Sequence, residues 1–84
     1  MSTAAKNTSI LVGLGNDSQL RTLMYHLMTE GSITQKDAIA YYSIYRLAAR
    51  IADLRDAGAE IRTEKVQNQG RGYHAKYILE GVRA

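Results

Sequence analysis

The sequence contains no cysteine among its 84 residues. This absence excludes a disulfide scaffold, a thiolate zinc site and a cysteine nucleophile. Long hydrophobic runs are also missing, and the longest uncharged apolar stretch, residues 10–14, is far too short to cross a bilayer. No basic segment is followed by a long apolar one, so no secretory signal is visible. We therefore expect a small cytoplasmic protein that does not associate with a membrane.

The excess of positive charge is small, and it lies in one half of the chain. The net charge is +3, and residues 43–84 carry eight basic and five acidic side chains, whereas residues 1–42 are neutral overall. Two windows in the second half, 43–52 and 65–79, contain basic residues and no acid. Such local basic windows indicate an electrostatic footprint for phosphates. Charge alone would favour a solvated surface over a binding site.

Hydrophobic spacing predicts helices in the first two thirds of the chain. A stripe at i, i+3, i+4, i+7 and i+8 predicts a first helix over 18–30, which Gly31 ends. The stripe consists of Leu20, Leu23, Met24, Leu27 and Met28. The segment 32–34 is short and includes the β-branched Ile33 and Thr34, with room for a single bridge of strand.

Two further helices are expected between residues 34 and 58. Thr34 and Asp37 resemble a capping box that starts a second helix, which runs to about Tyr41 and buries Ala38 and Ile39. Ser43 is the expected N-cap of a third helix, closed by Gly58. The apolar stripe of this third helix would consist of Ile44, Leu47, Ala48, Ile51 and Leu54.

After residue 58 the spacing of the hydrophobic residues changes from a helical period toward a period of two, which is typical of strands. Residues 59–67 and 73–79 are rich in β-formers and flank a segment of glycines and amides, which predicts a hairpin with a long tip. Residues 80–84 are expected to be a frayed tail. Residues 1–9 are expected to be a mobile tail. Residues 10–15 are expected to be a short strand, or an apolar segment that packs on the domain or on a partner. The order of elements is typical of an α+β winged helix-turn-helix over residues 16–80.

The predicted third helix carries the first set of candidate contacts. A recognition helix typically inserts its N-terminal end into the major groove, and the basic and aromatic side chains lie in its first two turns. Ala49 is small enough to touch a thymine methyl group. The candidate contacts here are Ser43, Tyr45, Arg46, Ala49 and Arg50. Arg55 falls within the apolar arc and is expected to cross the seam between the first and third helices or to pair with Glu30 or Glu60.

The second helix and the hairpin tip supply the other candidates. Gln35 and Lys36 would touch a phosphate at the start of the second helix, where backbone N–H groups are unpaired. On the hairpin, Arg71 is the side chain that we expect to insert into a minor groove. The hairpin residues that would supply positive charge or neutral hydrogen-bond donors are Lys65, Asn68, Gln69, Arg71 and Lys76.

Residues 31–61 and the segment Tyr73-x-x-x-Tyr77-Ile78-Leu79 resemble a family of short winged helix-turn-helix proteins common in bacteriophages and other mobile elements. The family pattern joins G-x-I-T-x-x-x-A to I-x-R-L-A-A-R-I-x-x-L-R-x-x-G-x-x-I and a tyrosine-containing strand. The matching positions are Ile33, Thr34, Ala38, Ile44, Arg46, Leu47, Arg50, Ile51, Leu54, Arg55, Gly58, Ile61 and Tyr77. The resemblance implies DNA binding, no reaction, and a bacterial host cell as the location.

Catalysis and metal binding find little support in the sequence. Ser32, Thr34 and Ser43 have no evident base, and His26 and His74 have no second ligand at metal-binding spacing. We therefore expect no catalytic residue, no metal and no cofactor. The favoured function is sequence-specific binding of double-stranded DNA, as a small transcriptional regulator or an excision-type architectural factor. A homodimer or an array on DNA is expected, because one module reads few base pairs. A winged-helix module for protein–protein interaction is the alternative.

Overall fold

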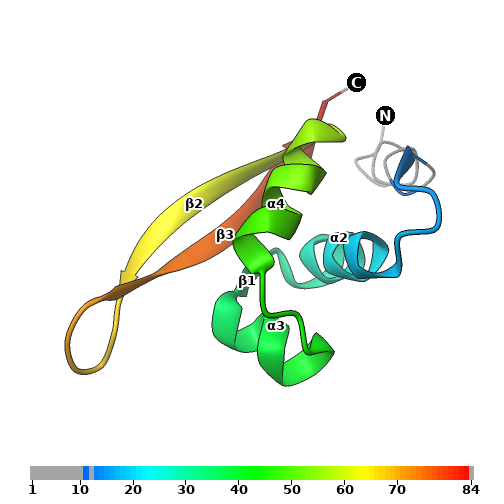
Figure 1. The fold of residues 1–84 in the computed structure, drawn as a ribbon. Coiled ribbons are helices and arrows are strands. Elements are labelled where there is room, and N and C mark those ends of the chain that lie inside the picture. The colour runs from blue at the N-terminus through cyan, green and yellow to red at the C-terminus, as the bar shows by residue number, and fades with distance from the viewer. Residues whose placement is uncertain (1–10, 12, 84) are drawn as a thin grey trace.

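The structure is a computed structural model that describes residues 11 and 13–83. Helices come first and a long hairpin last, as Figure 1 shows. The elements are α2 (Ser18–Glu30), β1 (Ser32–Thr34), α3 (Gln35–Tyr42), α4 (Leu47–Asp56), β2 (Ala59–Gln67) and β3 (Tyr73–Val82). This is the winged helix-turn-helix arrangement of the α+β class that the sequence predicts.

The strands form an antiparallel sheet in the order β1-β3-β2. Strand β1 is short and pairs only with the middle of β3, where Ile33 lies opposite Tyr77. Beyond it, β2 and β3 continue as a two-stranded ribbon that projects away from the helices (Figure 1). We call the β2–β3 hairpin the wing and residues 68–72 its tip.

The core lies where α2, α4 and the sheet meet. Ile51 and Leu54 of α4 are fully buried, and so are Leu23 and Leu27 of α2. This burial removes their apolar surface from water, which is the main favourable term in folding. The largest fully buried side chains are Leu23, Met24, Leu27, Ile33, Ile44, Leu47, Ile51 and Leu54.

The ends of the first two helices confirm the local predictions. Helix α2 has the predicted bounds and ends at Gly31, whose φ of 87° is readily adopted by glycine. At the start of α3, the Thr34 hydroxyl accepts from the Asp37 N–H while the Asp37 carboxylate accepts from the Thr34 N–H. The capping box therefore fixes where β1 ends and α3 begins.

The predicted start of the third helix at Ser43 was wrong. Ser43 instead ends α3 in the left-handed region, with φ 56°, and its N–H donates to Ile39 O. Ile44 then turns into the core, with only 2% of its surface exposed, and α4 begins at Leu47. Tyr45 and Arg46 therefore lie in the α3–α4 connection and not on a helical face.

Two residues predicted to be buried are exposed. Ile39 is 40% exposed, because the eight-residue α3 buries only Ala38. Ala48 is exposed because the buried stripe of α4 is narrow, with Leu47, Ile51 and Leu54 at i, i+4 and i+7. The solvent-facing side of α4 is consequently rich in small residues.

The predicted frayed tail was wrong for residues 80–82. Strand β3 runs to Val82, which is buried opposite Ala59, and Glu80 pairs with Arg62. At the other end, Leu14 is buried against the core. Ile10, Val12 and the predicted mobile tail 1–9 lie outside the described residues. Within the described range, no helix is long and apolar enough to cross a membrane.

Candidate nucleic-acid interface

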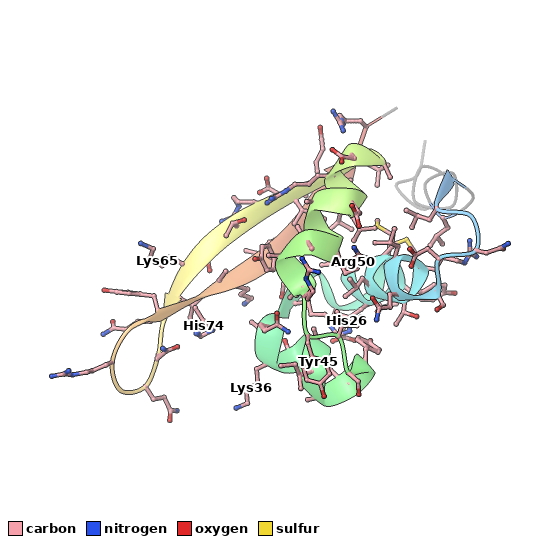
Figure 2. The ribbon with its side chains drawn as sticks, in the orientation of Figure 1. His26, Lys36, Tyr45, Arg50, Lys65 and His74 are labelled. Atoms are coloured by element: carbon pink, nitrogen blue, oxygen red, sulfur yellow. The ribbon has the colours of Figure 1, made fainter. Side chains whose placement is uncertain are left out.

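The α3–α4 connection presents an aromatic and a basic side chain to solvent. Tyr45 is 69% exposed, and Arg46 is exposed beside it. Figure 2 shows Tyr45 at the end of α4 that lies next to α3. Ser43 is exposed in the same connection, and Ala49 is half-buried in the first turn of α4. Four of the five candidates predicted on the third helix thus gather at one end of α4.

Arg50, the fifth candidate, is engaged within α4. Its Nη2 lies 3.0 Å from the Asp53 carboxylate, one turn further along the helix. This pairing draws the guanidinium toward the C-terminal end of α4. The Arg50 Nε is buried and has no hydrogen-bond partner among the described residues. Arg50 therefore retains an unused donor at the side of α4 (Figure 2).

Gln35 and Lys36 are neighbours with different surroundings. The Gln35 amide donates to Ile44 O at 2.8 Å, and its carbonyl accepts from the Leu47 N–H at 3.2 Å. Gln35 thus clamps both sides of the connection that carries Tyr45. Lys36 is exposed on the first turn of α3.

The two lysines predicted on the wing lie on opposite faces of the sheet. Successive strand residues alternate between faces. Lys65 shares a face with Thr63, which reaches α4 through a 2.9 Å bond from Arg55. Lys76 lies opposite Glu64, on the other face. Lys65 therefore faces the α4 side, where its Nζ lies 5.6 Å from the centroid of the exposed Tyr73 ring.

A groove separates the start of α3 from the wing. It has a volume of about 600 Å³ and is lined by Thr34, Gln35, Lys36, Gln67, Asn68, Gln69 and His74. Gln67 and His74 were not among the predicted contacts. Strand alternation could have identified His74, since it lies two residues from Lys76. The groove brings the predicted residues of α3 and of the wing tip together, with Gln69 and Arg71 exposed at the tip.

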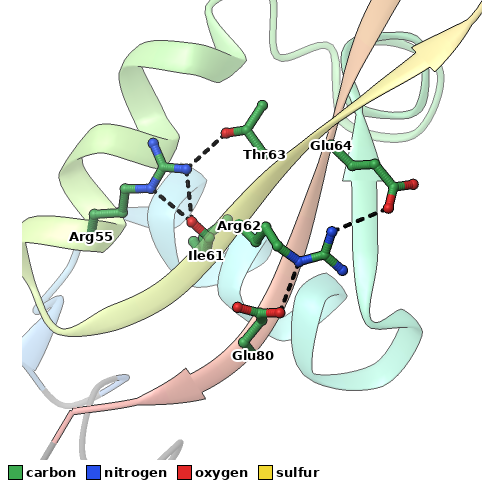
Figure 3. A network of polar contacts seen from close by, with 6 residues as sticks. All are labelled: Arg55, Ile61, Arg62, Thr63, Glu64 and Glu80. Atoms are coloured by element: carbon green, nitrogen blue, oxygen red, sulfur yellow. Dashed lines mark hydrogen bonds and ion pairs between the residues drawn. The ribbon is translucent and has the colours of Figure 1, made fainter.

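At the base of the wing, two arginines are held by hydrogen bonds and ion pairs within the protein (Figure 3). Arg55 donates to Ile61 O at 2.7 and 3.1 Å, so its predicted pairing with Glu30 or Glu60 was wrong. The Ile61 carbonyl and the Thr63 hydroxyl satisfy the guanidinium instead. Arg62 pairs with Glu80 at 2.8 Å and Glu64 at 3.1 Å, and these hydrogen bonds raise its pKa.

The aromatic side chains between α2 and α3 form a separate cluster. The Tyr42 hydroxyl lies 2.6 Å from His26 Nδ1, and burial together with the nearby Glu30 raises the pKa of Tyr42. The described residues contain no group of three or more His, Cys, Asp or Glu side chains able to hold a metal ion. His26 is accordingly a hydrogen-bond partner in this structure.

The chain was compared with known proteins. No curated protein and no solved structure matches it. Residues 18–81 match the family of winged helix-turn-helix domains, and this segment runs from the first residue of α2 nearly to the end of β3. Domains of this kind typically bind DNA and are generally non-catalytic. The match covers well over half of the sequence, so the chain belongs to the winged helix-turn-helix domain family.

Proposed function

We propose that this protein binds double-stranded DNA sequence-specifically, as a small transcriptional regulator or an excision-type architectural factor of a phage or mobile element. The observation that carries the proposal is that the α3–α4 connection exposes Tyr45 and Arg46 while Lys36 lines a groove between α3 and the wing. Gln35 lines this groove and also bonds to Ile44 and Leu47, the residues on both sides of Tyr45 and Arg46, so the start of α3 joins the two surfaces.

The major groove would receive the N-terminal end of α4. Arg46 is free to reach a guanine edge or a phosphate, and Arg50 can do so once it leaves Asp53. Tyr45 would add a hydroxyl donor and a flat apolar surface. The exposed Ala48 and the half-buried Ala49 would let the helix approach the bases closely, because neither side chain extends beyond Cβ.

The flanking backbone would lie along the groove and the wing. Lys36 at the groove and Lys65 on the opposite, α4-facing side of the wing would neutralise phosphates, and Arg71 at the tip would enter the adjacent minor groove. Gln69 would donate to the sugar-phosphate strand. Lys76 shares the face of His74 but lies opposite Glu64, whose charge offsets its own, and we expect it to contribute least among the predicted contacts. Gln35 would act by holding the connection in shape.

Selection from a random duplex library tests this proposal. A specific site should be enriched and should bind at least roughly 10³-fold more tightly than random duplex at the same salt concentration. An Arg46→Glu/Arg50→Glu variant should lose this binding in a salt-sensitive way. Equal affinity for all sequences would contradict sequence specificity. Normal binding by the double variant would contradict the assigned face.

Protein–protein interaction is a second candidate, favoured by a different surface. Tyr25 and Tyr41 are 61% and 67% exposed. This surface includes the side of α2 and α3 that carries His26 and Tyr42. It could hold a second copy of the chain in a homodimer or array on DNA. Sedimentation of the protein with and without its selected site would detect such assembly.

A further inference from the structure

The wing tip is closed by hydrogen bonds from one residue, Asn68. Its backbone N–H donates to Gly72 O at 3.0 Å, and its side-chain Nδ2 donates to Arg71 O at 2.9 Å. Its Oδ1 lies 2.6 Å from His74 Nδ1. The sequence predicts Asn68 as a DNA contact, but both polar atoms of its side chain have partners within the hairpin.

These bonds are mutually consistent in their direction. Because the Asn68 amide group donates to Arg71 O, Oδ1 is the atom that faces His74 and must accept. His74 therefore donates from Nδ1, and its Nε2 remains available toward the groove that His74 lines. Gly72 completes the loop with φ 80°, a conformation that glycine adopts without strain.

We propose that Asn68 is a positioning residue that holds the wing tip in shape and thereby presents Arg71 to DNA. The inference rests on the proposed DNA-binding function and adds a residue that acts through Arg71. A loop already ordered in the free protein loses little conformational entropy on binding, which is the general benefit of preorganisation. Without the Asn68 side chain, residues 69–71 would have to be ordered when the complex forms.

The test compares Asn68→Ala with Gln69→Ala in fluorescence-anisotropy titrations of a duplex across a salt series. Both variants remove one amide from the tip, but no hydrogen bond of the Gln69 side chain is found within the described residues. Asn68→Ala should weaken binding roughly fivefold to tenfold without changing the slope of log K against log[salt], because Arg71 is still present. Arg71→Ala should flatten that slope by about 0.9. Gln69→Ala removes a proposed direct contact, so its loss should add to that of Arg71→Ala. An unchanged affinity in Asn68→Ala, or a changed slope in that variant, would overturn the proposal.

The Asn68→Ala/Arg71→Ala double variant separates positioning from contact. If Asn68 acts through Arg71, the double variant should bind within about twofold of Arg71→Ala alone. Additive losses would show that Asn68 touches DNA directly and would overturn the proposal. His74→Ala removes one of the two side-chain bonds and should lower affinity by less than Asn68→Ala does. A larger loss in His74→Ala would also contradict it.

A measurement without DNA keeps the two proposals distinguishable. Backbone order parameters from NMR relaxation should be near 0.85 for residues 69–72 in the wild type and fall below about 0.6 in Asn68→Ala. An unchanged tip in Asn68→Ala would overturn the positioning role even if DNA binding is strong. If neither the wild type nor any variant binds DNA, but the tip loses order in Asn68→Ala as expected, the proposed function fails and the role of Asn68 in the hairpin stands.

Discussion

The base and the tip of the wing use the same residue type in opposite ways. At the base, Arg55 and Arg62 are engaged by Ile61 O, Thr63, Glu64 and Glu80. At the tip, the Arg71 side chain makes no hydrogen bond or ion pair with any described residue. An arginine near acceptors stabilises the fold through its hydrogen bonds. An arginine in an acid-free segment remains available to a partner. The presence of acceptors beside each arginine therefore distinguishes the structural base of the wing from its proposed binding tip.

The largest effect is expected from removing one of the arginines that stabilise the base of the wing. Arg55→Met should lower the free energy of unfolding by about 1.5–3 kcal/mol, because the Ile61 carbonyl and the Thr63 hydroxyl lose a charged donor. Urea unfolding measures the change. Arg46→Met is the matched control. Its side chain is exposed and makes no hydrogen bond or ion pair with a described residue, so the change should alter stability by no more than about 0.5 kcal/mol. Similar losses in both variants would contradict the division of roles.

Gln35 and Lys36 repeat the comparison at adjacent positions in α3. Gln35→Ala should lower the free energy of unfolding by about 1–2 kcal/mol, since Ile44 O and the Leu47 N–H lose their side-chain partner. Lys36→Ala should leave stability nearly unchanged and flatten the salt dependence of DNA binding by about 0.9. Thermal unfolding and anisotropy of the same two samples measure both effects. The account fails here if Lys36→Ala is the more destabilising change.

A smaller effect is expected at Arg50, which pairs with Asp53 within α4 and is also a proposed DNA contact. Asp53→Asn should release Arg50 and raise affinity for duplex DNA about twofold to threefold, because a partly exposed ion pair contributes less than about 1 kcal/mol. Asp56→Asn removes an equal charge from α4 without touching Arg50 and should have a smaller effect. Identical gains would point to general repulsion of phosphate by acidic residues and not to the Arg50–Asp53 pair.

Local signals in the sequence predicted much of this fold. The bounds of α2, the Thr34–Asp37 capping box and the hairpin follow from spacing, caps and turn residues over short segments. The start of α4 was missed because Ser43 suits both an N-cap and the left-handed end of a helix. Burial of Ile44 in the core favours the second choice, and such a tertiary contact is not visible in a local pattern.

The candidate site was predictable in composition but not in the use of each side chain. The acid-free windows located the α3–α4 connection and the wing tip, where Arg46 and Arg71 are exposed. Gln35 and Asn68 look like DNA contacts in the sequence, yet their amides bond within the protein. Their roles depend on backbone carbonyls and N–H groups at the α3–α4 connection and at the wing tip, and a sequence pattern does not show where such groups point.

The salt dependence of duplex binding tests the central claim most directly, with Arg46→Gln and Arg62→Gln compared against the wild type. Each variant removes one positive charge, one at the proposed interface and one at the base of the wing. With four to six phosphates neutralised, the wild-type plot of log K against log[salt] should have a slope of about −4 to −5. Arg46→Gln should flatten this slope by about 0.9 and Arg62→Gln should leave it unchanged. A flat wild-type plot, or equal slopes in the two variants, would contradict the account.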